Sequence, residues 1–318
     1  MSRLLAAFAA PALLFAAPAF AQPPAATPAV APDPGTPAAS FSSDRIGVTV
    51  MGTGPDVVLI PGLSSTPSVW AGTMAALPGY RYHLIHVSGF AGRPAGANAQ
   101  GSYLAPVADE IARYISEAHL EHPAVVGHSM GGSWTIMLAA RHPELVGKAM
   151  VVDMLPYLGI MLRAQGMSEA QMTQTIDQMQ NMLANAPAEQ RRMFTSMMVS
   201  AMVNTESEKQ PAINASLASD PVVSAQGFTD LMRTSLLDDV ARIRAPLVVL
   251  YTQPASQPGG PSPSPEQIDR AYQLSYQGAP QAVVRRVPNS AHFIMIDNAP
   301  FFQEQLRTFL TTPGTPRP

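Results

Sequence analysis

Short apolar runs alternate with amphipathic segments over most of the chain. Runs rich in Val, Ile and Leu, a composition typical of strands buried in a sheet, lie at 57–60, 82–86, 124–126, 149–152, 247–251 and 282–287. Between them the pattern predicts helices at 68–77, 104–118, 132–141, 266–276 and 301–310. In the second of these, Val107, Ile111 and Ile115 fall on one face. This alternation predicts an α/β fold with a doubly wound, mostly parallel sheet.

One further strand-like run, 46–50, precedes the strand 57–60, and Gly52-Thr53-Gly54-Pro55 lies between the two. Glycine and proline between two such runs are typical of a β-hairpin. The pattern therefore predicts that 46–50 and 57–60 form an antiparallel hairpin, which leads into the first central strand.

Regular alternation stops after Asp153. Residues 157–240 contain no strand-like run, and we expect an inserted helical region there. Methionine is frequent in this region, at Met161, Met167, Met172, Met179, Met182, Met193, Met197, Met198, Met202 and Met232. Flexible thioethers either fill the region's own core or roof an apolar pocket, and the sequence leaves both interpretations open.

The N-terminal residues differ in composition from the rest of the chain. Arg3, an apolar stretch at 4–15 and then Ala19-Phe20-Ala21 are typical of a secretory signal peptide, which we place at 1–21. Residues 22–40 are rich in Pro and Ala and predict a disordered tether. We therefore expect an exported protein, periplasmic or secreted, without an integral membrane segment once the signal is removed.

These boundaries predict the domain organisation of the chain. The sheet and its helices, the core, are expected at 41–156 and 241–312, interrupted by the helical region at 157–240. A short tail follows at 313–318. A single domain with an insertion is as compatible with 318 residues as two domains are.

Composition narrows the classes of function. Charged residues make up only 13% of the chain, the formal net charge is −3, and there is no basic block, so a small molecule is a better expected partner than nucleic acid. The absence of cysteine excludes disulfides and thiol nucleophiles. His119-Leu120-Glu121-His122 offers metal-ligand residue types, but its place at a helix end favours a solvated surface cluster. No metal or other cofactor is expected, and the oligomeric state is not determined.

The chemistry is expected at Gly127-His128-Ser129-Met130-Gly131, where an apolar strand runs directly into a predicted helix. Small residues at both ends of this segment permit a tight strand-to-helix turn. Such a turn projects the serine hydroxyl above the sheet, with a helix N-terminus behind it that stabilises negative charge. Ser129 is therefore the candidate nucleophile, and the alternative is an ordinary serine that caps the helix.

Together with Gly132, this segment resembles the nucleophile elbow of the alpha/beta-hydrolase superfamily, and the resemblance covers nearly all of the chain after residue 40. A serine nucleophile needs a base, and the resemblance implies His292, which follows the last predicted strand. It also implies that the backbone amides of Leu63 and Met130 form the oxyanion hole. The region 157–240 would then be a helical cap. His128, beside the serine, is expected to point elsewhere.

The acid that orients His292 is not determined by the sequence. In most members of the superfamily it follows the strand after the cap, but the loop 252–261 contains no acid. Asp153 ends the strand after the elbow helix, a position that a minority of the superfamily uses, at the ligand-binding edge of the sheet. Glu266 is the second candidate, and a dyad or another acid stays open. Asp153 would otherwise only cap the turn after its strand.

The favoured interpretation is a serine hydrolase that cleaves a small, largely apolar carboxylic ester through an acyl-enzyme. Ser129 would attack, His292 would move the proton and Asp153 would hold the imidazole. The alternatives within the same fold are a cofactor-free perhydrolase or an amidase. From a different class comes a binding or signalling protein that keeps the fold without turnover.

Overall fold

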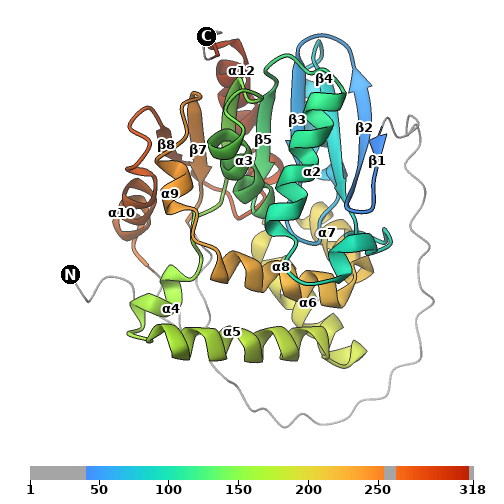
Figure 1. Ribbon diagram of the computed structural model, residues 1–318, viewed down its shortest axis with the longest axis vertical. Coiled ribbons are helices and arrows are strands. Elements are labelled where there is room, and N and C mark those ends of the chain that lie inside the picture. The colour runs from blue at the N-terminus through green and yellow to red at the C-terminus, as the bar shows by residue number, and fades with distance from the viewer. Residues whose placement is uncertain (1–40, 254–262, 315–318) are drawn as a thin grey trace.

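The computed structural model describes residues 41–253 and 263–314. They contain one eight-stranded sheet in the order β1-β2-β4-β3-β5-β6-β7-β8. The expected signal peptide and tether, and part of the expected tail, lie outside the described residues. The strands are β1 Phe41–Ser42, β2 Ile46–Gly52, β3 Asp56–Ile60, β4 Arg81–Val87, β5 Ala124–His128, β6 Lys148–Val152, β7 Leu247–Tyr251 and β8 Val283–Arg286. From β4 to β8 the neighbouring strands pair in parallel, which confirms the predicted sheet (Figure 1).

The predicted hairpin between the first two strand-like runs is wrong. β2 pairs antiparallel with β4, with Val48 opposite Ile85. β3 instead lies between β4 and β5 and pairs in parallel with both. The apolar residues of β3 from Val57 to Ile60 are fully buried, so this strand gains more from a central position than from pairing with its sequence neighbour. Glycine and proline at 52–55 indicate a turn but do not determine which strands pair.

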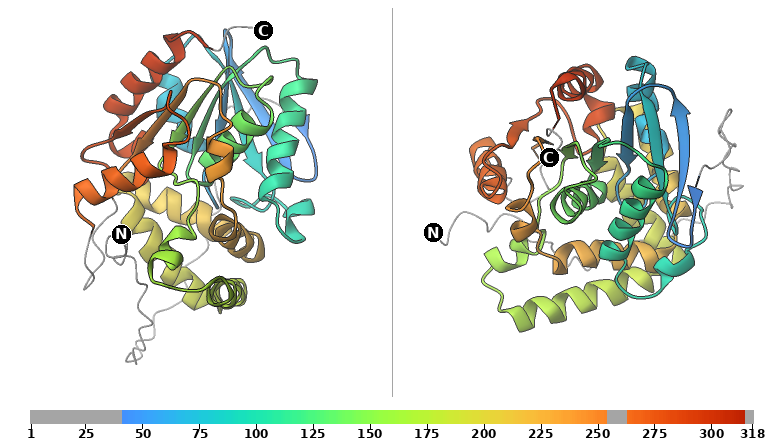
Figure 2. Two further views of the ribbon diagram at one scale, coloured as in Figure 1. Left: turned by 60° about the vertical axis from the view of Figure 1, so that its left-hand side comes forward. Right: turned by 45° about the horizontal axis from the view of Figure 1, so that its top comes forward.

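Helices cover both faces of the sheet (Figures 1 and 2). Side chains of alternate strand residues pack on one face against α2 Leu104–Glu117, α3 Met130–Arg141, α9 Leu237–Val240 and α10 Pro265–Tyr276. On the other face they pack against η1 Pro67–Trp70, the adjoining α1 Ala71–Ala76, α11 Ile294–Asp297 and α12 Ala299–Thr311. In β3, for example, Val58 and Ile60 belong to the first core while Val57 and Leu59 belong to the second. The two-residue period of a strand thus divides the apolar residues into two cores.

Between β6 and β7 the chain forms helices, as the loss of alternation predicts. They are α4 Ile160–Ala164, α5 Glu169–Ala184, α6 Ala188–Met202, α7 Glu206–Ala218, α8 Pro221–Arg233 and α9. We call α4 to α8 the inserted helices. In Figure 1, α8 lies between α5 and the edge of the sheet. No helix in 41–253 or 263–314 is both long and apolar enough to cross a membrane.

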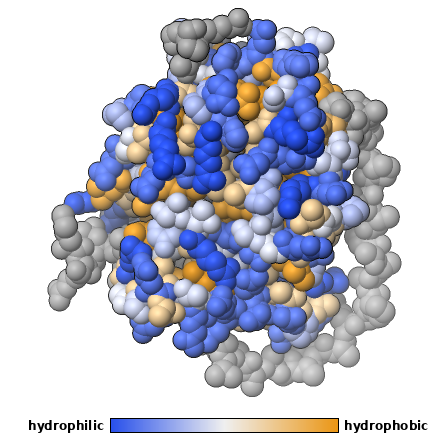
Figure 3. All heavy atoms as spheres, viewed as in Figure 1, coloured by the Kyte–Doolittle hydropathy of each residue, from blue (hydrophilic) through white to orange (hydrophobic). Residues whose placement is uncertain are grey.

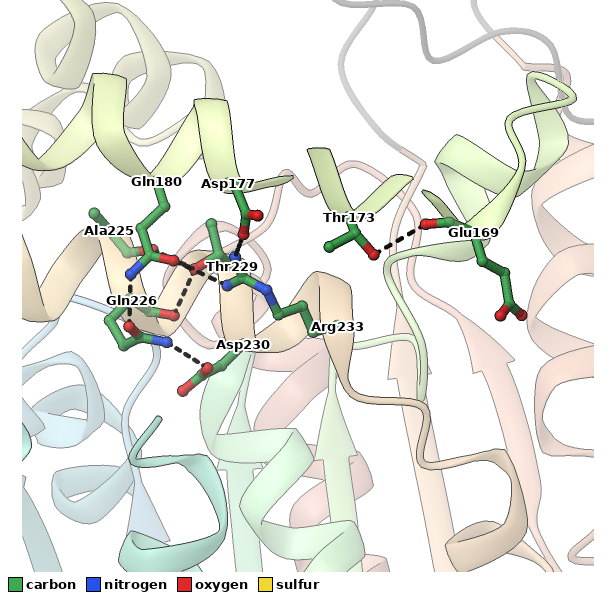
Figure 4. Close-up of polar contacts among 9 residues, drawn as sticks. All are labelled: Glu169, Thr173, Asp177, Gln180, Ala225, Gln226, Thr229, Asp230 and Arg233. Atoms are coloured by element: carbon green, nitrogen blue, oxygen red, sulfur yellow. Dashed lines mark hydrogen bonds and ion pairs between the residues drawn. The ribbon is translucent and has the colours of Figure 1, made fainter. Parts of the chain in front are cut away.

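Polar side chains join α5 to α8 (Figure 4), and one side chain of α8 also bonds to the core. Gln180 donates to Gln226 at 2.6 Å, and Arg233 forms an ion pair with Asp177 at 2.6 Å. Asp230 of α8 accepts a bond at 3.1 Å from the backbone N–H of Tyr103, next to α2. The inserted helices are therefore fastened to the core by directional bonds as well as by apolar packing.

The methionines of the inserted region differ widely in their burial. Met172 and Met232 are buried in a small cluster with Leu162 and Ile176, so some of these side chains fill a core of their own. Others are exposed: Met182, Met193, Met197 and Met198. α6 buries no residue at all. The face of the molecule in Figure 3 is mainly polar, with apolar residues scattered over it.

Candidate active site

Ser129 occupies a strained turn between β5 and α3. Its backbone angles are φ 53° and ψ −124°, in a region that residues with a Cβ rarely adopt. Its N–H donates to the carbonyl oxygen of Val152 at 2.8 Å, and its own carbonyl accepts from Gly132 N–H at 2.7 Å. The ends of β5 and β6 are thus tied together beside the serine, which is partly exposed.

The glycines on either side of Ser129 are required by close backbone packing. A Cβ atom at Gly127 would lie 2.0 Å from the carbonyl oxygen of Gly131. A Cβ atom at Gly131 would lie 2.4 Å from the carbonyl oxygen of Ile60. Neither separation is tolerated by real atoms, and backbone cannot move aside as a flexible side chain can. The two glycines therefore allow α3 to start directly against β3 and β5, as the sequence motif predicts.

His292 and Asp153 lie in direct contact, although 139 positions separate them in the sequence. Nδ1 of His292 lies 2.7 Å from Oδ2 of Asp153. When Nδ1 carries the proton and donates it to the carboxylate, Nε2 is left as the basic nitrogen. An imidazole held in this tautomer is suited to accept a proton from a hydroxyl. Asp153 follows β6 directly and has a positive φ of 53°, which is uncommon for a residue with a Cβ.

The second oxygen of Asp153 also has partners. Oδ1 accepts the backbone N–H of Thr252 at 2.9 Å and the hydroxyl of Tyr272 at 3.2 Å. Burial and the nearby carboxylate raise the pKa of Tyr272 well above its usual value, so its hydroxyl remains a donor. These bonds fix the carboxylate that meets His292. Nothing in the sequence marks either donor, apart from the spacing of Ile268, Tyr272 and Tyr276 along one predicted helix.

Glu266, the other candidate acid, lies elsewhere. Its carboxylate is exposed at the start of α10 and accepts from the Ser264 hydroxyl at 2.7 Å. Among the described residues, Glu266 forms no hydrogen bond or ion pair with His292. Of the two carboxylates considered from the sequence, only Asp153 bonds to the imidazole.

His128 does not point away from the site, contrary to the expectation. Its ring lies 4.6 Å from the His292 ring, centroid to centroid, and its Nε2 lies 3.0 Å from the His292 carbonyl oxygen. Full burial, followed by the charge of His292, lowers the pKa of His128 well below its usual value. The ring is therefore neutral and donates from Nε2. Because His128 adjoins Ser129, this contact places the loop of His292 beside the serine turn.

The loop after β3 approaches Ser129 from the other side. A Cβ atom at Gly62 would lie 2.9 Å from Cβ of Ser129, so Leu63 follows at close range. Met130 is the first residue of α3, where a backbone N–H has no acceptor within its own helix. Neither Leu63 nor Met130 donates a backbone hydrogen bond to another residue in the described part of the chain. Both N–H groups are thus available to an oxyanion, and the positive end of the helix supports negative charge there.

Within 41–253 and 263–314, no group of three or more His, Cys, Asp and Glu residues is arranged to hold a metal ion. His119, Glu121 and His122 are exposed at the surface, where the sequence places a solvated cluster. The groups that gather at the candidate site are a hydroxyl, an imidazole, a carboxylate and backbone amides.

The comparisons with known proteins agree with this architecture. A pimeloyl-[acyl-carrier protein] methyl ester esterase of Aeromonas hydrophila is 34% identical over 113 residues, which cover 35% of this chain and 42% of that protein. An esterase from Exiguobacterium antarcticum shares the fold, with a TM-score of 0.68 and 17% identity over 84% of this chain and 96% of the esterase. The bromoperoxidase from Bacillus anthracis also has a TM-score of 0.68, with 19% identity and the same coverage. The model of the alpha/beta hydrolase family matches residues 57–304. This chain therefore belongs to the alpha/beta hydrolase family.

Proposed function

We propose that the protein is a serine hydrolase that cleaves carboxylic esters through an acyl-enzyme. The observation that carries the proposal is the 2.7 Å contact between His292 Nδ1 and Asp153 Oδ2, beside the strained turn of Ser129. A carboxylate, an imidazole and a serine hydroxyl in this chain order are the parts that nucleophilic acyl transfer requires. The likeness to esterases named above supports the same reaction class.

In the first half of the reaction, Oγ of Ser129 attacks the acyl carbon while Nε2 of His292 accepts the hydroxyl proton. The N–H groups of Leu63 and Met130 donate to the carbonyl oxygen as it becomes an oxyanion; each such donor contributes roughly 3 kcal/mol to the barrier reduction. The ester C–O bond then breaks, and His292 passes its proton to the departing alkoxide. Asp153 stabilises the imidazolium that exists between these two transfers.

In the second half, water takes the place of the alcohol. His292 removes a proton from the water as its oxygen attacks the acyl-serine, and the acid product leaves when Ser129 recovers its proton. An amidase would share the first half with an amine as leaving group. A perhydrolase would differ only in that hydrogen peroxide attacks the acyl-enzyme. The same residues therefore serve all three reactions, and the favoured one is ester hydrolysis.

For the substrate we propose a small ester with a largely apolar acyl or alkyl group, and for the inserted helices the function of a cap. The abundance of methionine from α4 to α8 supports this, because thioether side chains adapt to apolar groups of varied shape. We also propose export from the cytoplasm, to the periplasm or the medium, on the basis of Arg3, the apolar stretch 4–15 and Ala19-Phe20-Ala21.

A fluorophosphonate probe tests the proposal. The folded protein is expected to be labelled, and Ser129→Ala is expected to remain folded and unlabelled. p-Nitrophenyl esters of increasing chain length, a matching anilide and hydrogen peroxide as acceptor then distinguish esterase, amidase and perhydrolase. Folded wild-type protein that neither reacts with the probe nor hydrolyses any ester would favour a binding protein instead.

A further inference from the structure

Asp297, which closes the short helix α11, accepts hydrogen bonds from two separate parts of the chain. Its Oδ2 accepts the backbone N–H of Ala291 at 3.0 Å, in the loop that carries His292. Its Oδ1 accepts the backbone N–H of Thr205 at 2.8 Å and the Thr205 hydroxyl at 2.9 Å. The backbone N–H of Asn204 lies 3.0 Å from Oδ1 and 3.1 Å from Oδ2. Asn204 and Thr205 lie in the junction between α6 and α7.

The same two segments also contact each other directly. The N–H of Phe293 donates to the carbonyl oxygen of Met202 at 3.3 Å. Val203, only 1% exposed, belongs to the same buried cluster as Phe293 and Ile294. The α6–α7 junction, residues 202–205, is therefore docked against the histidine loop, residues 288–293, by apolar packing and by hydrogen bonds on both sides of His292.

The backbone of His292 is held from three directions. The residue before it bonds to Asp297, the residue after it bonds to Met202, and its own carbonyl oxygen accepts from His128. A ring whose Nδ1 must remain within hydrogen-bond distance of Asp153 depends on where this backbone lies. Errors of about 1 Å in such placement are enough to lower a reaction rate by roughly a hundredfold.

We propose that Asp297 is a positioning residue that couples the inserted helices to His292. Its carboxylate joins the α6–α7 junction to the histidine loop, so that a displacement of α6 and α7 moves the imidazole. The proposal rests on the proposed function only for its effect on catalysis; the mechanical coupling stands on the contacts of Asp297. A carboxylate offers two oxygens that can each accept more than one hydrogen bond, which suits it to joining two segments.

Two substitutions weaken this link in different ways. Asp297→Asn replaces one acceptor oxygen with an NH₂ group, which cannot accept the bonds made on that side. Thr205→Pro removes the backbone N–H and the hydroxyl of Thr205 but leaves the Ala291 bond in place. The φ of Thr205 is −70°, which proline adopts without strain. Asp239→Asn is the control, because Asp239 is buried and pairs with Arg141 at 2.9 Å, away from His292.

Amide hydrogen exchange and ester hydrolysis are measured on all four full-length proteins. We expect Thr205→Pro to speed amide exchange in residues 288–293, although the substitution lies outside that loop. We expect Asp297→Asn to speed exchange both in residues 202–205 and in residues 288–293. Each is expected to lower kcat about tenfold with little change in KM, whereas Asp239→Asn lowers thermal stability without these effects. Unchanged exchange of 288–293 in Thr205→Pro would overturn the coupling. Wild-type protein that resists the fluorophosphonate probe would instead refute the proposed function, while exchange would still decide the coupling.

Discussion

At the scale of single residues, Asp153 is held in the candidate site by several contacts. Its side chain is only 10% exposed, and it bonds to His292, Thr252 and Tyr272. A buried carboxylate with this many donors cannot rotate freely. The contribution of the Asp153 carboxylate and the contribution of one hydrogen bond to it can be measured separately by substitution.

We predict that Asp153→Asn lowers kcat about 10⁴-fold, because the amide no longer holds His292 in the tautomer with a basic Nε2. Glu266→Gln is the matched control and is expected to retain near wild-type kcat, since Glu266 is exposed and its side chain bonds to Ser264 rather than to His292. Hydrolysis of a p-nitrophenyl ester measures both. If the Glu266 variant lost activity and the Asp153 variant kept it, the acid would have to be reassigned.

Tyr272→Phe removes one donor from Asp153 and leaves the ring in place. We predict a kcat loss of roughly fivefold, equivalent to about 1 kcal/mol for one hydrogen bond, with the Thr252 bond retained. Tyr276→Phe is the control: Tyr276 is also buried, in the same aromatic stack, but its hydroxyl donates to the Met154 carbonyl at 2.7 Å. Equal losses of activity in the two variants would show that the stack, not the bond to Asp153, matters.

At the scale of elements, the site depends on α3 meeting β3 and β5 without side chains between them. Gly131 lies against the backbone of Ile60, whereas Gly72 in α1 has no atom within 4 Å of the place where a Cβ would go. The cost of an added methyl group should therefore differ between two glycines that are both helical.

We predict that Gly131→Ala lowers the free energy of unfolding by about 1–3 kcal/mol, because the methyl group would overlap backbone that cannot move aside. Gly72→Ala should leave it unchanged or raise it by up to about 1 kcal/mol, because alanine favours helix. Urea denaturation followed by circular dichroism measures both. A Gly131 variant as stable as the wild type would contradict the backbone packing described for the elbow.

At the scale of the whole molecule, the two apolar cores on either side of the sheet leave some histidines with little access to water. Burial, with a smaller contribution from the charge of Arg93, lowers the pKa of His86 from 6.5 to about 4. Burial also lowers the pKa values of His83 and His128. As the pH falls below about 6.5, these histidines take up protons in the unfolded chain while their rings stay neutral in the folded protein. Proton uptake therefore stabilises the unfolded state. The free energy of unfolding is highest above about pH 6.5 and decreases as the pH falls.

We predict that lowering the pH from 7 to 5 decreases the free energy of unfolding by about 2 kcal/mol through His86 alone, because His86 is protonated first in the unfolded state. His86→Gln should reduce this pH dependence, and His119→Asn, at an exposed histidine, should not. Urea denaturation at the two pH values measures the difference. A pH dependence in His86→Gln as steep as in the wild type would show that the other groups account for it.

Local patterns in the sequence determined most of the elements and the position of the elbow. Strand 247–251 and the parallel sheet follow from apolar runs of strand length, and Gly127 and Gly131 mark a turn that only small residues permit. These features depend on neighbouring residues, whose preferences act over a few positions. For the same reason the sequence identified Ser129 as the candidate nucleophile before any contact was known.

Only the tertiary structure decided which distant segments meet. The pairing of β2 with β4 rather than β3, the choice of Asp153 over Glu266 as the partner of His292, and the position of His128 against that ring are contacts between residues far apart in the chain. A turn signal or a charged residue type is compatible with several such partners. The free energy of burying whole strands and satisfying buried polar groups selects among them, and that energy exists only in the packed molecule.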